Sequence, residues 1–241
     1  MMQKLSLLLL PGTLCDATLF THQVKYLSDV AVPQVVDISL QDNLHDVAQY
    51  VLSQVDGQFA VAGLSYGGIV AFELWRQARE RITKIALLNT NPYAASPQTR
   101  EYQQRFVGMA HLGEFQEVTT DFLKDIMLHP EHQKDLALRE QVLDMAKSIG
   151  IEGFVNEIKA QLARPDSMPD LPHIDCPVLV LTGREDMVVP VTVHEAMHDK
   201  LPNSHLMLVE HCGHLSTMEQ PDIVTGALRD WLTESGVWQA E

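Results

Sequence analysis

Six short apolar runs constrain the fold of this chain more than any other feature of its sequence. Each run has four to seven residues, is rich in Leu, Val and Ile, and is bounded by turn residues. They lack the apolar–polar alternation of a half-exposed sheet, so each is typical of a strand buried on both faces. The runs are Leu5–Leu10, Val32–Ile38 (interrupted by Pro33 and Gln34), Phe59–Leu64, Ile82–Leu88, Val178–Leu181 and His205–Val209.

Helical patterns separate several of these runs. Strands that alternate with helices form parallel βαβ units, so the sequence predicts an α/β fold with helices on both faces of the sheet. Apolar residues recur at helical spacing in three sets: Leu44, Val47, Val51 and Leu52; Ile69, Phe72, Leu74 and Trp75; and Ile223, Val224, Leu228, Trp231 and Leu232.

The segment 94–164 interrupts the alternation, because it contains helical patterns and no strand candidate. Gly113, Pro130, Gly150 and Pro165 punctuate it. We therefore expect a core domain of residues 1–93 and 165–241 with a helical cap at about 94–164. The cap is either a lid over an apolar pocket or an ordinary helical subdomain. Its clearest apolar faces are Phe115/Val118/Phe122/Ile126 and Phe154/Val155/Ile158/Leu162; Tyr102/Phe106/Ala110 and the segment 130–148 give two weaker patterns.

Composition and charge narrow the function classes. Hydrophobic residues make up 46% of the 241 residues and charged residues 20%, which is typical of a globular protein and excludes a disordered chain. The net charge is −15. Such an acidic protein repels nucleic-acid backbones and anionic membrane surfaces, so we expect neither as a partner.

The cysteines and the N-terminal apolar run favour a cytoplasmic protein. Cys15, Cys176 and Cys212 lie far apart, and an odd number without a CxxC pair argues against both a disulfide framework and a zinc site. The run Leu5–Leu10 is too short to span a bilayer, and Pro11 follows at once in place of a signal-peptide cleavage site.

The sequence Gly63-Leu64-Ser65-Tyr66-Gly67-Gly68 follows a strand candidate and precedes a helical pattern. A nucleophilic serine must stand on a sharp, strained turn, and side chains two positions before and after it would collide with the neighbouring backbone. The start of the helix also places backbone N–H groups near a developing negative charge. The motif therefore predicts that Ser65 is a nucleophile; the alternative is a glycine-rich turn with an idle serine.

A serine hydroxyl needs a general base, and the base needs an orienting carboxylate. Both residue types follow later strand candidates: Glu185 and Asp186 come after Val178–Leu181, and His211 and His214 come after His205–Val209. The carboxyl ends of parallel strands are where open α/β sheets place their sites.

These motifs, taken in order, resemble the α/β-hydrolase superfamily in its small branch with a helical cap, which includes carboxylesterases, acyl-thioesterases and carbon–carbon bond hydrolases. The resemblance covers nearly the whole chain and rests on the serine motif, on Gly183-x-x-Asp186-x-x-x-Pro190, and on Gly213-His214 followed by Glu219-x-Pro221. It implies that Ser65 is the nucleophile, His214 the base and Asp186 the acid.

Rivals remain for each role. Glu185 neighbours Asp186, and His211 lies three residues before His214 but lacks the preceding glycine. Cys15 and Cys212 lie outside any nucleophile turn, so we interpret them as small buried hydrophobes. Some relatives place the acid after the strand that follows the nucleophile helix. Here that strand ends in Asn89-Thr90-Asn91-Pro92, which contains no carboxylate.

The resemblance also predicts an oxyanion hole made of two backbone N–H groups. Tyr66 supplies one of them, and Thr13, in the loop after the first strand, supplies the other. Relatives commonly have His-Gly in this loop, whereas this chain has Pro11-Gly12-Thr13. Because that loop begins so near the start of the chain, there is no room for the two extra edge strands of many relatives. We therefore expect a mostly parallel sheet of about six strands. Predicted pocket residues are Leu64, Tyr93 and Leu215.

The sequence thus predicts a serine hydrolase that cleaves a small carboxylic ester or acyl thioester through an acyl-enzyme. A lyase or carbon–carbon bond hydrolase with the same triad is the first alternative, and a non-catalytic binding protein of this fold is the second. We expect no metal and no organic cofactor, and a small-molecule substrate as the partner. Homo-oligomer formation is left open. The triad does not identify the substrate.

Overall fold

The computed structural model of the protein describes residues 4–124 and 126–233, without the side chains of residues 121–124. Its six strands form one sheet in the order β2-β1-β3-β4-β5-β6, and every neighbouring pair is parallel. This confirms the predicted α/β fold and its six-stranded sheet. The strands are β1 Leu5–Leu10, β2 Ala31–Val35, β3 Phe59–Leu64, β4 Ile82–Leu88, β5 Val178–Gly183 and β6 Ser204–Val209.

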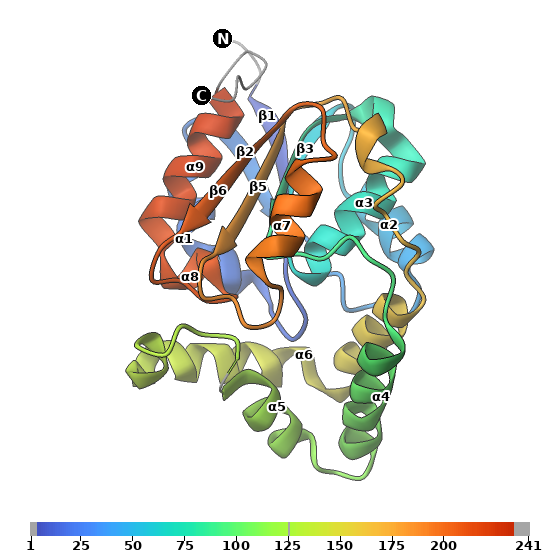
Figure 1. The fold of residues 1–241 in the computed structure, drawn as a ribbon, viewed down its shortest axis with the longest axis vertical. Helices are drawn as coiled ribbons and strands as arrows, with labels where there is room; N and C mark the ends of the chain where they lie inside the picture. Colours follow the sequence, from blue (N-terminus) through green and yellow to red (C-terminus); the bar gives the residue numbers. More distant parts are fainter. Residues whose placement is uncertain (1–3, 125, 234–241) are drawn as a thin grey trace.

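Helices cover both faces of the sheet (Figure 1). Helices α1 (Thr21–Leu27) and α9 (Pro221–Thr233) lie on one face, and α2 (Leu44–Ser53), α3 (Tyr66–Ala78) and α7 (Val191–His198) lie on the other. Adjacent residues of β1 show why the strand is apolar throughout. Leu7 and Leu9 pack in the same cluster as Trp231 of α9, whereas Leu8 and Leu10 pack with Phe72 of α3.

Three helices lie together beyond the carboxyl ends of the strands, at the bottom of Figure 1. They are α4 (Pro97–His111), α5 (Phe115–Lys124) and α6 (Leu136–Leu162), and a short 3₁₀ turn at His132–Lys134 precedes α6. The two helical patterns expected on either side of Gly150 are two helical segments that share the label α6, and the non-helical backbone of Gly150 (φ 71°, ψ −177°) separates them by a kink. Glycine reaches this positive φ without the steric cost that other residues carry.

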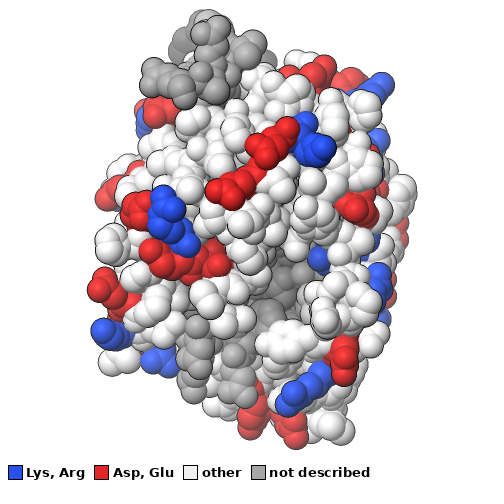
Figure 2. All heavy atoms as spheres, in the orientation of Figure 1, with Lys and Arg blue, Asp and Glu red and all other residues white. Residues whose placement is uncertain are grey.

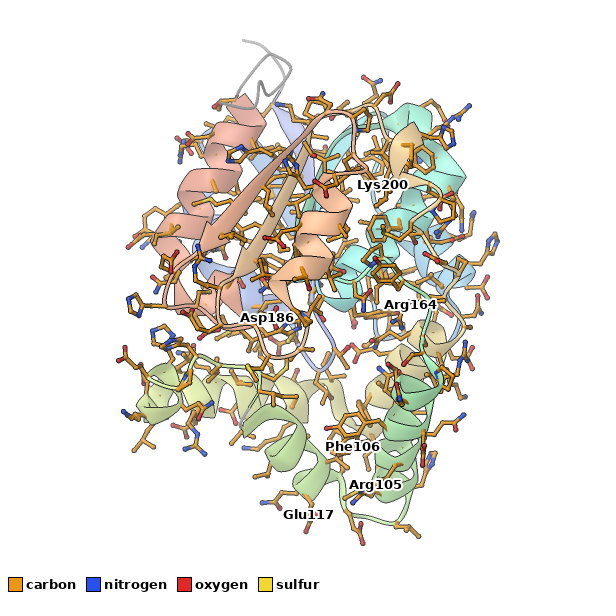
Figure 3. The ribbon with its side chains drawn as sticks, in the orientation of Figure 1. Arg105, Phe106, Glu117, Arg164, Asp186 and Lys200 are labelled. Atoms are coloured by element: carbon orange, nitrogen blue, oxygen red, sulfur yellow. The ribbon has the colours of Figure 1, made fainter. Side chains whose placement is uncertain are left out.

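Apolar faces of these three helices pack on the core rather than only on each other. Phe106 of α4, Val118 of α5 and Phe154 of α6 belong to the same buried cluster as Leu7 of β1 and Trp231 of α9. Phe106 points from α4 toward α5 (Figure 3). The side chain of Phe122, assigned to one apolar face from the sequence, lies outside the described residues.

Some boundaries differ from those predicted. The second strand was expected over Val32–Ile38 but is shorter, Ala31–Val35, because the chain turns at Asp37, whose carboxylate accepts hydrogen bonds from the N–H and hydroxyl of Ser39. Pro33 is tolerated because β2 lies at the sheet edge. The sequence patterns did not indicate the short helices α1, α7 and α8 (Ser216–Glu219).

Charged side chains are spread over the surface. On the face shown in Figure 2, acidic side chains are interspersed with basic ones among the described residues. Within residues 4–124 and 126–233, no helix has the length and apolar character needed to cross a membrane.

Candidate active site

Ser65 stands on a strained turn between β3 and α3. Its backbone has φ 53° and ψ −111°, a conformation that non-glycine residues rarely adopt. The Ser65 N–H donates to the Leu88 carbonyl (2.9 Å), and the Ser65 carbonyl accepts a hydrogen bond from the Thr90 hydroxyl (2.7 Å). Neighbouring β4 therefore holds the turn in place. A residue kept in such a conformation by its surroundings is typical of a functional site.

Three glycines permit this turn, and for Gly63 and Gly67 the reason is the one that the sequence motif indicated. A Cβ atom on Gly63 would lie 2.3 Å from the backbone of Gly67, and a Cβ atom on Gly67 would lie 2.0 Å from the Leu10 carbonyl oxygen. A Cβ atom on Gly68 would lie 2.5 Å from the side chain of Thr90. These distances are far below van der Waals contact, so the close approach of β1, β3, β4 and α3 requires glycine at all three positions.

Substitution of Gly67 tests this requirement. We expect Gly67→Ala to lower the free energy of unfolding by about 3 kcal/mol, because the new methyl group must displace the β1 backbone. Gly226→Ala is the matched control, since no atom outside the helix lies within 4 Å of its Cβ position in α9. That control should raise stability by about 0.5–1 kcal/mol through helix propensity. Urea denaturation of both variants measures the difference, and equal stabilities would contradict the argument.

The predicted acid and base are in direct contact. Nδ1 of His214 lies 2.8 Å from Oδ2 of Asp186, and His214 and Asp186 are 1% and 6% exposed. The other carboxylate oxygen of Asp186 accepts hydrogen bonds from the N–H groups of Val188 (2.8 Å) and Val189 (2.9 Å). In Figure 3, Asp186 lies at the lower end of β5, on the edge that α4–α6 cover.

Electrostatics keep Asp186 ionised. Burial opposes its charge, but the adjacent His214, the amide of Asn89 and the Val189 N–H together hold the pKa of Asp186 below its usual value. An ionised carboxylate accepts from Nδ1–H of the imidazole and so fixes the tautomer in which Nε2 carries a free lone pair. His214 is thus oriented as a proton acceptor.

Asn89 takes part in the site although the sequence showed only the absence of a carboxylate there. Its Nδ2 donates to Oδ2 of Asp186 (2.9 Å) and to the carbonyl of Gly213 (3.2 Å), so it connects the loops after β4, β5 and β6. Asn89 has φ 48°, a conformation that asparagine tolerates better than most residues. In the sequence, the only indication of this role was that a polar segment, Asn89-Thr90-Asn91, directly follows a buried strand.

His194 is a second residue that the sequence did not single out. It is fully buried on α7, and its Nε2 accepts a hydrogen bond from the N–H of Thr90 (3.1 Å). Burial lowers the pKa of His194 to about 4, so the imidazole stays neutral and keeps this acceptor. Because the Thr90 hydroxyl donates to the Ser65 carbonyl, His194 indirectly supports the turn that carries Ser65.

Glu219, part of the motif that follows His214, holds the histidine loop. One carboxylate oxygen accepts from the N–H groups of Gly213 (3.0 Å) and Leu215 (3.2 Å) on either side of His214. The other accepts from the N–H of His129 (2.7 Å) and lies 2.9 Å from Nδ1 of His132. Glu219 therefore fixes the backbone on both sides of His214 and ties it to the segment that joins α5 to α6.

The rival residues are placed differently. Glu185 accepts a hydrogen bond from the N–H of Cys212 (3.0 Å), whereas the carboxylate that His214 pairs with is that of Asp186. His211 is exposed, and its ring packs against that of His129. Cys15 and Cys212 are buried, and burial raises the pKa of both thiols, so neither is a reactive thiolate.

The loop after β1 lies beside Ser65. A Cβ atom on Gly12 would lie 3.3 Å from Cδ2 of Leu64 and 3.4 Å from the Cβ of Ser65, so the backbone of this loop approaches the serine closely. The N–H groups of Thr13 and Tyr66 make no hydrogen bond within the described part of the chain. They are therefore available as donors. The Ser65 hydroxyl likewise bonds to no described residue, and catalytic hydrogen bonds are often long in the absence of substrate.

The predicted pocket residues divide into two groups. Leu64 and Leu215 are fully buried in the cluster that also contains Phe106 and Phe154, whereas Tyr93 is 39% exposed and its carbonyl accepts from Arg164. A cavity of about 510 Å³ lies between the loops after β1 and β2 and the helix α6. Neither Ser65 nor any of the three pocket residues lines this cavity, so Leu64, Tyr93 and Leu215 stay predictions.

Comparison with known proteins identifies the family. The alpha/beta hydrolase family model matches residues 10–227, so the chain belongs to this family. A pimeloyl-(acyl-carrier protein) methyl ester esterase of Nitrosomonas europaea is 27% identical over 193 residues, which cover 75% of this chain and 74% of that protein.

Solved structures agree. A thermophilic esterase from Thermogutta terrifontis, determined with malate bound, superposes with a TM-score of 0.86 at 27% identity, covering 95% of this chain and 90% of the other. The enol-lactonase of Burkholderia xenovorans gives the same TM-score at 20% identity over 96% and 92% of the chains, and supports the fold alone. The predicted family and the predicted class of enzyme, a hydrolase of ester bonds, are confirmed.

Proposed function

We propose that this protein cleaves a small carboxylic ester or acyl thioester through a covalent acyl-enzyme, with Ser65 as nucleophile, His214 as general base and Asp186 as the orienting acid. The observation that carries the proposal is the strained serine turn at the same sheet edge as the buried Asp186–His214 pair. The methyl ester in the name of the Nitrosomonas relative supports an ester as the substrate.

The mechanism follows from the geometry of the pair. Asp186 holds Nδ1–H of His214, so Nε2 accepts the proton of the Ser65 hydroxyl as its oxygen attacks the carbonyl carbon. The resulting imidazolium then gives that proton to the departing alcohol or thiol. Water attacks the acyl-enzyme in the reverse sequence, losing its proton to His214 and releasing the carboxylic acid and free Ser65.

The tetrahedral intermediate carries a negative oxygen, which the backbone N–H groups of Thr13 and Tyr66 stabilise. Tyr66 is the first residue of α3, so the positive end of the helix dipole adds to its N–H. Stabilisation by one such donor is typically worth about 10²–10³ in kcat.

Activity assays test this proposal. Wild-type protein is incubated with p-nitrophenyl esters of graded acyl length, with acyl thioesters and with diketones, and a fluorophosphonate probe is mapped by peptide mass. We expect ester or thioester turnover and a single adduct on Ser65. Turnover of diketones alone supports the carbon–carbon hydrolase in place of the esterase. If the wild-type protein turns over none of these substrates and is not labelled by the probe, the result supports a non-catalytic binding protein.

We further propose that α4, α5 and α6 (within residues 94–164) form a cap that selects the substrate. They lie beyond the sheet edge that holds Ser65, and their apolar faces share a buried cluster with Leu64 and Leu215. Apolar walls with a few polar groups are typical of small-molecule pockets.

Shortening an aromatic side chain of the cap is expected to change acyl-length preference while the chemistry stays the same. Phe106→Leu and Phe115→Leu should shift the preferred chain length, because both rings pack against the cluster. Fluorophosphonate labelling of Ser65 should stay within about three-fold of wild type, since the catalytic groups are untouched. Leu112→Ala, at a position that is 79% exposed, is the control. If every folded variant keeps the wild-type acyl-length preference, the cap is a scaffold and does not select the substrate.

The setting proposed for the enzyme is the cytoplasm. Cys15, Cys176 and Cys212 are all unpaired thiols, which suits a reducing compartment. The net charge of −15 suits a small-molecule partner better than a nucleic acid or an anionic membrane.

A further inference from the structure

Helix α6 reaches the loop after β1 through two buried side chains. Oε2 of Glu157 accepts a hydrogen bond from the N–H of Leu14 (2.9 Å), and Nε2 of Gln161 donates to the hydroxyl of Thr13 (2.9 Å). Glu157 and Gln161 are one helical turn apart, and Nε2 of Gln161 also donates to the Glu157 carbonyl (3.2 Å). They are 1% and 6% exposed. Helix α6 is thus hydrogen-bonded to the two loop residues that follow Gly12.

The loop needs such support. Leu14 has φ 60°, an unfavourable backbone conformation for a residue with a branched side chain. Residues in such conformations persist only where their surroundings impose them. A loop without this support would relax, and the Thr13 N–H would move away from the carbonyl oxygen that it must meet.

We propose that Glu157 and Gln161 are positioning residues, which hold the Thr13 N–H in place as an oxyanion donor and so couple the seating of the cap helix to catalysis. This inference rests on the proposed function. It also explains how a loop with Pro11-Gly12-Thr13, which lacks the histidine common in relatives, is anchored: the anchor comes from α6.

The protonation state of Glu157 matters for this role. Burial raises its pKa to about 8, the hydrogen bond from Leu14 N–H opposes this rise, and the charge of Asp37 adds to it. Burial raises the pKa of both Cys15 and Tyr66, and the charge of Glu157 adds to each rise, so these two groups stay neutral. Glu157 is therefore mostly neutral at about pH 7 and becomes an anion above about pH 8.

An anionic Glu157 would oppose catalysis. Its carboxylate contacts the residue next to Thr13, so its negative charge would repel the oxygen that becomes negative in the transition state. At the effective dielectric constant of a protein site, one such charge within several ångströms costs about ten-fold or more in rate. The pH dependence of the rate thus reports on Glu157 separately from the fold.

Three variants test the proposal. Glu157→Leu removes the acceptor, Gln161→Leu removes the donor, and Glu157→Gln keeps a neutral acceptor of the same shape. Gln23→Leu is the matched control, because Gln23 is equally buried but bonds to the Thr217 carbonyl and the Thr225 hydroxyl instead. Steady-state kinetics on the best p-nitrophenyl ester and inhibition by an aryl trifluoromethyl ketone are measured for all four.

We expect Glu157→Leu to lower kcat by about 10²-fold and Gln161→Leu by about 10-fold, with KM changed less than about three-fold. Affinity for the ketone, whose adduct carries the oxyanion, should fall by the same factors as kcat. Gln23→Leu should reduce thermal stability and leave kcat near that of wild type. Glu157→Gln should retain at least about a third of wild-type kcat at about pH 7, because Oε1 of glutamine still accepts from Leu14.

The pH profile separates positioning from a merely structural role. Wild-type kcat should fall above about pH 8, where Glu157 becomes charged, and this fall should be absent from Glu157→Gln. The comparison of these two proteins tests the proposal even if Glu157→Leu fails to fold. An identical alkaline fall in Glu157→Gln, or a folded Glu157→Leu with wild-type kcat and ketone affinity, would overturn it while ester hydrolysis stands. A wild-type protein that neither turns over nor takes the fluorophosphonate label removes the proposed function, and this inference with it.

Discussion

Replacing Ser65 with alanine is expected to abolish ester turnover and leave the protein folded. Loss of a triad member that acts together with the others costs on the order of 10⁴-fold or more in kcat. Folding should be unaffected, because the Ser65 hydroxyl bonds to no described residue and the turn is held by backbone contacts to Leu88 and Thr90. Steady-state turnover and circular dichroism of the purified variant measure the two effects.

Ser65→Gly adds a control for strain. It lacks the same hydroxyl, but glycine adopts the backbone conformation of residue 65 (φ 53°) without steric cost. We expect Ser65→Gly to be as inactive as Ser65→Ala and about 1 kcal/mol more stable toward urea. Turnover by either variant near the wild-type level would disprove the nucleophile assignment. Equal stability of the two variants would show that the turn stores no strain.

The features that sequence predicted best are those fixed by local physics. The sheet was predictable because its buried parallel strands are apolar throughout, as Leu5–Leu10 and Phe59–Leu64 are. The serine turn was predictable because close backbone approach leaves no room for a Cβ atom at Gly63 or Gly67. Contact between Asp186 and His214 followed from their places after adjacent strands of the sheet.

The remaining site residues depend on contacts between distant parts of the chain. Leu14 and Glu157 are separated by 143 positions, and Asn89 and Asp186 by 97. In the sequence, Glu157 is one acidic residue in an amphipathic helix, indistinguishable from a solvated one. His194 is one of 11 histidines, and only its burial against Thr90 distinguishes it. Such roles arise from packing and leave no local pattern.

Short helices were missed for a related reason. Helix α7 has 8 residues and α8 has 4, too few for an apolar periodicity to stand out. Isolated helices of this length are unstable, so tertiary contacts determine where they form. The end of β2 was likewise set by the turn at Asp37 and Ser39, which the apolar pattern of Val32–Ile38 concealed.

Replacing His214 with alanine should remove activity together with its rise with pH. A general base must be neutral to accept the Ser65 proton, so wild-type kcat/KM should rise with pH from the acid side. Asp186 adds no second rise above about pH 5, because its pKa lies below the usual carboxyl value and it stays ionised there. We expect His214→Ala to lower kcat by about 10⁴-fold or more, and the residual rate should no longer show this rise with pH.

His211→Ala is the matched control, since it removes the same side chain three positions earlier in the same loop. His211 is exposed, and its ring packs against the ring of His129. His214, in contrast, is buried and contacts Asp186. The variant should keep most of the activity and the wild-type pH limb. We expect alanine at position 211 to keep the backbone φ of 51°, so the free energy of unfolding should fall by less than about 1 kcal/mol. An inactive His211→Ala beside an active His214→Ala would assign the general base to the other histidine, and would leave the buried Asp186–His214 contact as part of the scaffold.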